Sequence, residues 1–190
     1  MTKTLIVPGL GGSPAPHWQH WWAATDPHAA MVELSDPHRP VPAVWEIELA
    51  EAILRHPDSI LVAHSLGAVL VGRLLATWPH LPVRAALLVA PAETEGSDRI
   101  GHFGPIPRLK FDVPAIVVGS RNDPWMSFAR SCEVARAWGA DLVDLGFAGH
   151  VNVASGFGPW PGGLALRDRL ADRARVRVAV PPAGEWRTGA

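Results

Sequence analysis

The stretch ILVAHSLGA, residues 60–68, decides the fold class of this chain. Apolar residues lead into Ser65, and apolar residues at helical spacing follow it directly. A buried strand that ends on a serine and turns at once into a helix is typical of a nucleophile elbow. That turn needs small residues two positions before and two positions after the serine, and Ala63 and Gly67 meet this need. Alanine stands where the usual G-x-S-x-G motif has its first glycine, which adds a methyl group to the turn without forbidding it.

Short apolar runs rich in β-branched residues recur along the chain, with longer helix-like stretches between them. This alternation predicts an α/β fold, a compact sheet of about six mainly parallel strands with helices on both faces. The strands are expected at residues 4–7, 30–34, 59–63, 85–90, 115–119 and 141–145, and the helices at 43–55, 66–77, 127–138 and 163–174. Two long connections, residues 8–29 and 91–113, leave the carboxyl ends of strands, where open parallel sheets bind ligands.

The chain has 190 residues, which is enough for one domain with a sizeable core. We expect this domain to cover residues 1–175, followed by a loosely ordered tail over residues 176–190 that contains Pro181-Pro182. The N-terminal apolar run is too short for a signal peptide. No apolar run reaches the ~18 residues of a membrane helix, so no membrane association is expected.

Composition argues against several classes of function. The chain has 17 basic and 18 acidic residues and a formal net charge of −1, so nucleic acid is not expected as a partner. A single cysteine, Cys132, excludes an intramolecular disulfide and a cysteine-based zinc site, and it favours a reducing, cytoplasmic location. Tyrosine is absent, which excludes the catalytic Tyr/Lys pair of short-chain dehydrogenases.

A serine hydroxyl is a poor nucleophile until a base takes its proton, so Ser65 requires a histidine and a carboxylate. Asp123 follows the expected strand at 115–119, and His150 follows the last expected strand. The order serine, acid, histidine is the one that accompanies a nucleophile elbow. Because the carboxyl ends of parallel strands share one edge of the sheet, we expect the three side chains to meet there as a catalytic triad.

Two backbone amides are expected to stabilise the negative charge of a tetrahedral intermediate. The helix that follows Ser65 points the amide of Leu66 towards the serine oxygen. The glycine-rich loop PGLGGS, residues 8–13, is expected to supply the second donor from Leu10, with Gly9 setting the turn. The two amides would form an oxyanion hole.

Several short motifs together resemble a known family. They are PGLGGS at 8–13, HWQ at 17–19, AHSLG at 63–67, DP at 123–124 and GH at 149–150. The combination is similar to the small serine hydrolases of the α/β-hydrolase superfamily that are related to retinoblastoma-binding protein 9, which include bacterial members, and it covers residues 4–174. The resemblance implies a triad of Ser65, Asp123 and His150 on a trimmed α/β-hydrolase sheet that lacks the first two strands of larger enzymes. It implies no particular substrate.

Four residues are expected to border the substrate, namely Gly9, His64, Trp125 and Phe103. Trp125 lies close to the candidate acid in the sequence. Phe103 belongs to the connection 91–113, where it forms either part of a small lid or the anchor of that lid. The tryptophan cluster within residues 18–22 is expected to pack in the core rather than to line the substrate site.

The sequence also offers rival site residues. Asp144 is the main rival acid, but it lies within the last expected strand and should point away from the site, and Asp98 in the long connection is weaker. His17 and His20 have a spacing that suggests a metal site, yet no acidic residue or cysteine lies at a matching distance. No metal or cofactor is therefore expected.

These observations favour a serine hydrolase that acts through an acyl-enzyme intermediate on a small carboxylic ester, with an amide or a thioester as variants. They leave the oligomeric state open. One alternative is a non-catalytic protein-binding module on the same fold. Another is a dinucleotide-binding, Rossmann-like protein, suggested by GLGGSP at residues 9–14. There, Pro14 replaces the third glycine of the fingerprint, and no machinery for hydride transfer is visible.

Overall fold

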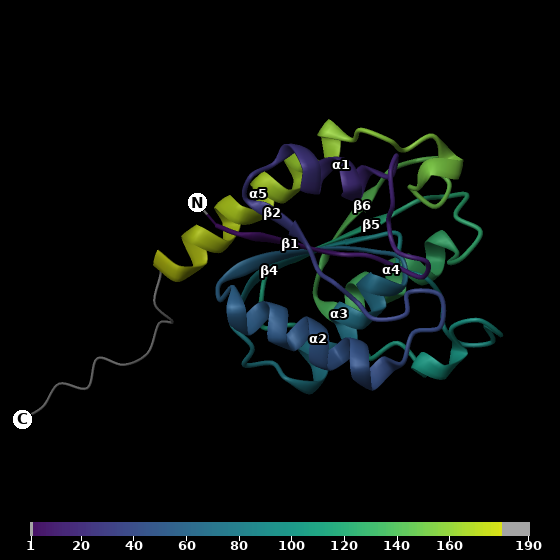
Figure 1. The fold of residues 1–190 in the computed structure, drawn as a ribbon, viewed down its shortest axis with the longest axis horizontal. Helices are drawn as coiled ribbons and strands as arrows, with labels where there is room; N and C mark the ends of the chain where they lie inside the picture. Colours follow the sequence, from purple (N-terminus) through teal and green to yellow (C-terminus); the bar gives the residue numbers. More distant parts are fainter. Residues whose placement is uncertain (1, 180–190) are drawn as a thin grey trace, which may run out of the picture.

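A six-stranded parallel sheet organises the computed structural model, which describes residues 2–179 (Figure 1). The strands are β1 (Thr4–Val7), β2 (Ala29–Met31), β3 (Ser59–His64), β4 (Val83–Val89), β5 (Ala115–Gly119) and β6 (Asp141–Asp144). They pair in the order β2-β1-β3-β4-β5-β6, and every pairing is parallel. The helices are α1 (Trp18–Thr25), α2 (Pro42–Arg55), α3 (Leu66–Thr77), α4 (Phe128–Trp138) and α5 (Pro161–Ala179), with 3₁₀ turns η1 (Gly101–Phe103) and η2 (Val153–Ser155).

Alternate side chains of the central strands pack into two hydrophobic cores, one on each face of the sheet. In β3, Leu61 and Ala63 point into the core shared with α2, α3 and α4, whereas Ile60 and Val62 point into the core shared with α1 and α5. Figure 1 shows the same division of helices between the two sides of the sheet. This period of two is the pattern of a strand buried on both faces.

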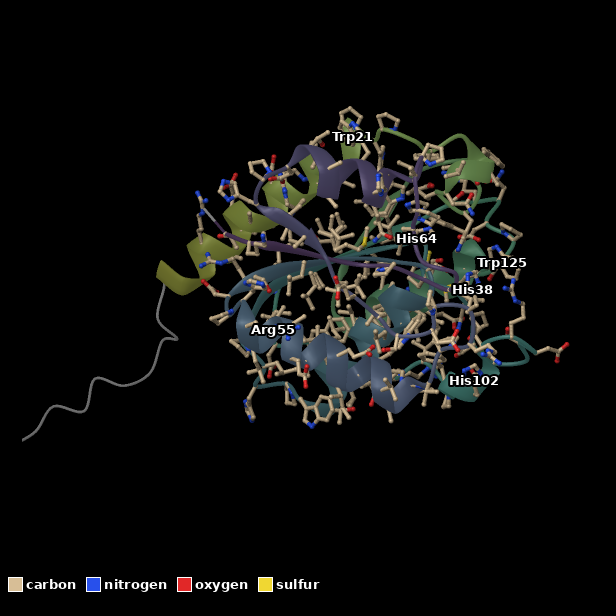
Figure 2. The ribbon with its side chains drawn as sticks, in the orientation of Figure 1. Trp21, His38, Arg55, His64, His102 and Trp125 are labelled. Atoms are coloured by element: carbon tan, nitrogen blue, oxygen red, sulfur yellow. The ribbon has the colours of Figure 1, made fainter. Side chains whose placement is uncertain are left out.

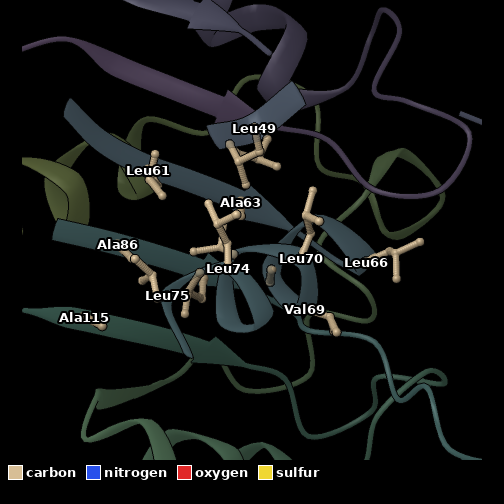
Figure 3. Close-up of a cluster of buried hydrophobic side chains, with 14 of the residues drawn as sticks. Leu49, Leu61, Ala63, Leu66, Val69, Leu70, Leu74, Leu75, Ala86 and Ala115 are labelled. Atoms are coloured by element: carbon tan, nitrogen blue, oxygen red, sulfur yellow. The ribbon is translucent and has the colours of Figure 1, made fainter. Parts of the chain in front are cut away.

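The two cores differ in composition. The core beneath α2, α3 and α4 is built mainly from leucine, valine and alanine, and Figure 3 shows Leu61 and Ala63 of β3 among the helical leucines. The opposite core contains Trp18, Trp22 and Trp160, whose rings pack against one another with centroids 5.1 to 6.3 Å apart. The expectation that the tryptophans of residues 18–22 pack in the core thus holds for Trp18 and Trp22, which are fully buried.

The structure confirms the α/β fold class and corrects some element boundaries. The connection at residues 8–29 contains an additional helix, α1, which the sequence pattern did not predict. Its N-cap is His17, a residue type that rarely caps helices, and its eight residues are too few for the helical spacing of Trp18, Trp21 and Trp22 to repeat along the sequence. β2 ends at Met31, earlier than expected, although the Val32 N–H still donates to the Ile6 carbonyl.

At the C-terminal end, α5 begins before the predicted helix and continues to Ala179. It therefore passes residue 176, where the tail was expected to begin, and residues 180–190 lie outside the described part of the chain. None of the helices in residues 2–179 combines the length and apolar content needed to span a lipid bilayer.

Candidate active site

Ser65 lies at the sharp turn between β3 and α3, with φ 56° and ψ −124°, a conformation that few L-residues adopt. Close packing explains why its neighbours are small. A Cβ atom on Gly67 would lie 2.4 Å from the carbonyl oxygen of Pro8, and one on Gly9 would lie 2.9 Å from the Cβ of Ser65. The elbow therefore presses directly against the loop that follows β1. Ala63 is fully buried behind the turn.

Ser65, His150 and Asp123 form a continuous row of hydrogen bonds at the carboxyl edge of the sheet. The Ser65 Oγ lies 2.8 Å from His150 Nε2, and His150 Nδ1 lies 2.9 Å from each carboxylate oxygen of Asp123. The three residues follow β3, β5 and β6, so the shared edge of the parallel strands brings them together. The side chains of His150 and Asp123 are 7% and 3% exposed.

The hydrogen bonds define where the protons lie. A carboxylate only accepts, so the Nδ1 of His150 carries the ring proton and donates it towards Asp123. The Nε2 atom then accepts from the Ser65 hydroxyl. Asp123 is itself oriented by the backbone N–H of Trp125, which donates to Oδ1 at 2.9 Å. This arrangement can remove a proton from the serine hydroxyl.

The rival acids lie elsewhere. Asp144 ends β6 and pairs with Arg121, whose guanidinium lies 2.6 Å from the carboxylate and holds the pKa of Asp144 below its ordinary value. Asp98 is exposed. Neither carboxylate hydrogen-bonds to a histidine among the described residues, so Asp123 is the acid that orients His150.

The loop at residues 146–152, here called the base loop, is held by side chains from other parts of the chain. Three of its backbone N–H groups donate to such side chains: Ala148 to Ser120 Oγ at 3.0 Å, Gly149 to Asn122 Oδ1 at 2.7 Å, and His150 to Ser155 Oγ at 3.0 Å. Sequence reasoning missed these three supporting residues, because short polar side chains in turns carry no distinctive pattern.

Two carbonyl groups of the base loop accept hydrogen bonds from aromatic side chains. His64 donates from Nε2 to the carbonyl of His150 at 2.8 Å, and Trp18 donates from Nε1 to the carbonyl of Val151 at 2.9 Å. Val151 has φ 49°, a strained value for a β-branched residue. The surrounding bonds hold this strained backbone next to the imidazole.

The backbone amides of Leu10 and Leu66 are the candidate donors of an oxyanion hole beside Ser65. Both residues border the same cavity as the Ser65 hydroxyl. Within residues 2–179, neither N–H donates to a protein acceptor, whereas the neighbouring Gly11 and Gly12 amides donate to the carbonyls of Pro37 and Gly9. Free amides beside a nucleophile match the requirement for an oxyanion hole.

Gln19 supports the loop that carries Leu10. This side chain is fully buried, donates from Nε2 to the carbonyls of Val7 and Val62 at 3.0 and 3.3 Å, and accepts from Ser13 Oγ at 2.6 Å. The amide thus links the ends of β1 and β3 to the glycine-rich loop. The sequence shows Trp18 and Gln19 only as parts of the HWQ motif. The structure shows that Trp18 supports the base loop and that Gln19 supports the glycine-rich loop.

The comparison with protein families agrees with this geometry. The model of the family described as serine hydrolase matches residues 4–169. The chain belongs to the serine hydrolase family. No curated protein sequence matches this hydrolase significantly.

Solved structures with the same fold include several hydrolases. A protein described as a YdeN-like hydrolase from Pectobacterium atrosepticum is 33% identical, with a TM-score of 0.79 over 93% of this chain and 92% of that one. The ydeN gene product of Bacillus subtilis is 21% identical, with a TM-score of 0.74 over 90% and 100%. MGS-MChE2, an α/β-hydrolase enzyme from a lagoon-sediment metagenome in Morocco, is 16% identical, with a TM-score of 0.69 over 90% and 91%.

A cavity of about 220 Å³ opens beside Ser65 in this hydrolase. It is lined by Gly9, Leu10, Gly12, His17, His64, Ser65, Leu66, Ala92, Ser97, Arg99, Ile100, Trp125, His150 and Asn152. Three of the four residues expected to border the substrate are therefore in the lining. Trp125 is 49% exposed, and Figure 2 shows it towards the periphery of the molecule, whereas His64 lies further inside.

Phe103 is the exception, and the expectation that it borders the substrate is wrong. Its side chain is 1% exposed and packs edge-on against Trp45, with ring centroids 5.9 Å apart. It belongs to the core with α2 and α3 and does not line the cavity. Phe103 therefore anchors the segment after β4, and Ile100 and Arg99 from that segment reach the cavity instead.

Two histidines besides His150 line the cavity of the hydrolase. Burial, together with the proximity of His150, lowers the pKa of His17 to about 4, and the same two causes hold the pKa of His64 well below its ordinary value. Both imidazoles are therefore neutral at pH 7. His20 lies exposed on α1, and residues 2–179 contain no group of three or more side chains suited to hold a metal ion.

Proposed function

We propose that this serine hydrolase cleaves small carboxylic esters through an acyl-enzyme intermediate on Ser65. The hydrogen-bonded row from Ser65 through His150 to Asp123 is the observation that carries the proposal, because it joins a strained nucleophile to an oriented base. The free amides of Leu10 and Leu66 beside the hydroxyl support it further.

In the first half of the reaction, Ser65 Oγ attacks the ester carbonyl carbon while His150 Nε2 takes the hydroxyl proton. The amides of Leu10 and Leu66 stabilise the resulting oxyanion. When the carbon–oxygen bond to the leaving alcohol breaks, His150 returns the proton to that alcohol. Asp123 keeps the imidazole in its Nδ1–H tautomer and stabilises the imidazolium that forms during the transfer.

In the second half, water attacks the acyl carbon and His150 takes a proton from it. Collapse of the second tetrahedral intermediate breaks the bond to Ser65 Oγ, which recovers its proton from the imidazole, and the carboxylic acid leaves. An amide or a thioester would follow the same steps with an amine or a thiol as leaving group. The cavity of about 220 Å³ supports small substrates, because sites for drug-sized ligands measure roughly 300–1,000 Å³.

The glycine-rich loop after β1 supports hydrolysis rather than dinucleotide binding. Gly9 packs against the Ser65 turn, and the Leu10 amide borders the cavity. In a dinucleotide fold, this loop would instead present its amides to a pyrophosphate at the start of a helix. Here α1 begins only at Trp18, after Pro14 and Pro16.

We also propose that the chain belongs to the branch of the family related to retinoblastoma-binding protein 9. The motifs at residues 8–13, 17–19 and 63–67 support this placement, together with Asp123-Pro124 and Gly149-His150. An alignment in which all of these motifs coincide with those of the branch would support the placement, and their scatter would contradict it.

Hydrolysis of p-nitrophenyl esters of graded acyl length tests the proposed function. We expect the wild type to prefer short acyl chains and Ser65→Ala to lose at least about 10⁴-fold in kcat/KM while remaining folded by circular dichroism. Ser35→Ala, which removes an exposed serine hydroxyl that pairs with Glu48, is the matched control and should retain activity. Esterase activity near the wild-type level in Ser65→Ala would contradict the assignment.

A further inference from the structure

Two buried imidazoles border the cavity and have no part in the proposed proton transfers. His17 is 6% exposed and His64 is 5% exposed, and both line the cavity. Their ring centroids lie 5.0 Å apart, and that of His64 lies 4.9 Å from the ring of His150. The three rings are therefore adjacent to one another in the cavity that Ser65 also lines.

Hydrogen bonds within the protein determine the tautomers of both rings. The Nδ1 of His17 accepts from the backbone N–H of Gln19 at 3.1 Å, so Nε2 carries the proton of the neutral ring. The Nε2 of His64 donates to the carbonyl of His150, so its Nδ1 is an unprotonated acceptor. The pair therefore has one remaining donor, His17 Nε2–H, and one remaining acceptor, His64 Nδ1.

Neither of these two atoms has a protein partner within residues 2–179. Among the described residues, the side-chain nitrogen and oxygen atoms that are inaccessible to solvent and also lack a hydrogen-bond partner are Trp22 Nε1, Ser59 Oγ and Arg84 Nε. The two imidazole nitrogens are not in this group, so both keep some access to solvent. Because both rings line the cavity, we take the cavity as the side from which they are accessible. A ligand that fills the cavity without pairing with these two nitrogens would leave them unpaired, which costs binding free energy.

The charge around the cavity restricts the kind of group that fits. His17 and His64 are neutral at pH 7 because burial and the nearby His150 lower their pKa values. No aspartate or glutamate among the described residues lines the cavity, and Arg99 is the lining residue with a permanent charge. An ammonium group would find no countercharge there, whereas a neutral group that both accepts and donates would satisfy both nitrogens.

We infer that His17 and His64 form a polar subsite for a hydroxyl or amide group that the ester substrate carries a few bonds from its scissile carbonyl. The group accepts from His17 Nε2–H and donates to His64 Nδ1. This inference rests on the proposed function, since it describes how that substrate is selected. The hydrolase would then favour hydroxylated or amidated short esters over purely aliphatic ones of the same size.

Two pairs of esters of matched shape test the subsite. The first pair, p-nitrophenyl 3-hydroxybutyrate and p-nitrophenyl 3-methylbutyrate, places the hydroxyl in the acyl group. The second pair, 2-hydroxyethyl butyrate and propyl butyrate, places it in the leaving group. The readout is the ratio of kcat/KM for the hydroxyl ester to that for its aliphatic partner, in the wild type, in His17→Asn and in His20→Asn.

His17→Asn is chosen because asparagine also accepts from the first turn of a helix, so α1 keeps its cap while the donor leaves the cavity. His20→Asn changes an exposed histidine on the same helix and serves as control. If His17→Asn does not fold, His17→Ser replaces it, because serine is also a preferred cap.

The subsite predicts a ratio of about ten for the wild type in at least one pair, a ratio near one in the His17 variant, and an unchanged ratio in His20→Asn. Equal rates on both members of each pair in the wild type, or a preference that survives in the His17 variant, would overturn the subsite while leaving ester hydrolysis intact. Failure of the wild type to hydrolyse any of the four esters would instead overturn the proposed function, and the subsite with it.

Discussion

The base loop and the segment at residues 95–100, here called the rim segment, border the same cavity but are held in opposite ways. The base loop receives hydrogen bonds from side chains as distant in the sequence as His64 and Trp18. The hydrogen bonds of the rim segment among the described residues are all local, such as Ser97 N–H to the Thr94 carbonyl and Ile100 N–H to Ser97 Oγ. Its one long-range polar contact there is the ion pair of the exposed Glu95 with Arg130 at 3.5 Å. Its residues are mostly exposed.

This difference suits two separate tasks, catalysis by the base loop and substrate binding by the rim segment. The proposed proton transfer from Ser65 to His150 requires sub-ångström placement, and the long-range contacts around the imidazole meet this requirement. A segment held by local bonds has a low cost of opening, which suits the entry and release of substrate. Substitutions in the base loop should therefore change turnover, whereas matched substitutions in the rim segment should change little beyond binding.

The largest effect is expected from Asp123→Asn. An amide donates as well as accepts, so it would favour the wrong tautomer of His150 and lower kcat by about 10⁴-fold. The matched control is Asp144→Asn, which changes the rival acid and removes its ion pair with Arg121, while the amide oxygen of asparagine can still accept from the Gly146 N–H. Steady-state kinetics on a p-nitrophenyl ester would distinguish the two variants. Comparable losses in both would contradict the assignment of the acid.

A smaller effect is expected from a pair of glycine substitutions that probes the two regions directly. Gly149 has φ 56°, and a Cβ there would lie 2.3 Å from Ser155 Oγ, so Gly149→Ala should displace His150 and lower kcat by about 100-fold. Gly96 has φ 75° but open space around it. Gly96→Ala should destabilise the fold by about 1 kcal/mol and leave kcat unchanged. Steady-state kinetics would measure kcat and urea denaturation would measure the free energy of unfolding of both variants. Equal values of kcat in the two variants would contradict the distinction between the two regions.

The indole of Trp18 should have a smaller influence on turnover. Trp18→Phe leaves the carbonyl of Val151 without its donor, and we expect about a tenfold lower kcat as well as lower stability. Trp22→Phe is the control, because Trp22 is equally buried but its Nε1 has no partner among the described residues. That variant should lose stability through packing alone. An equal decrease in kcat in both variants would contradict the proposal that Trp18 positions the base loop.

The smallest effect concerns pH. The unfolded chain protonates His17 near its ordinary pKa of 6.5, whereas the folded chain does so only near 4. Between these values, unfolding takes up a proton, so the free energy of unfolding should fall as the pH decreases from about 6.5 to about 4. Urea denaturation across this range should show that the free energy of unfolding depends less on pH in His17→Asn than in His20→Asn. Identical slopes would show that His17 is not held neutral by the fold.

Much of this architecture follows from the sequence because it is local. The elbow at Ser65 combines a strand, a turn and a helix within nine residues, 60–68, and the parallel alternation then places Asp123 and His150 at the same edge. Strand order, by contrast, depends on which neighbours pair across the whole sheet. The predicted ranges carry no information on that order.

The supports of the site were not predictable because they join residues remote in the sequence. Trp18 and Val151 are 133 positions apart, and nothing in either neighbourhood indicates their hydrogen bond. Helix α1 was missed for a related reason, since its stability comes from packing Trp18 and Trp22 against the sheet rather than from helix propensity. The mistaken role of Phe103 has the same origin, because its burial against Trp45 depends on the fold of a long connection.

The central claim is that Ser65 is a nucleophile activated by His150, and covalent labelling tests it most directly. Treatment with an organophosphonate probe should add one adduct per chain, located by peptide mass spectrometry on Ser65, and the adduct should be absent in Ser65→Ala. Labelling should also be strongly slowed in His150→Ala. A folded wild-type protein that does not react, or an adduct that persists in Ser65→Ala, would contradict the account.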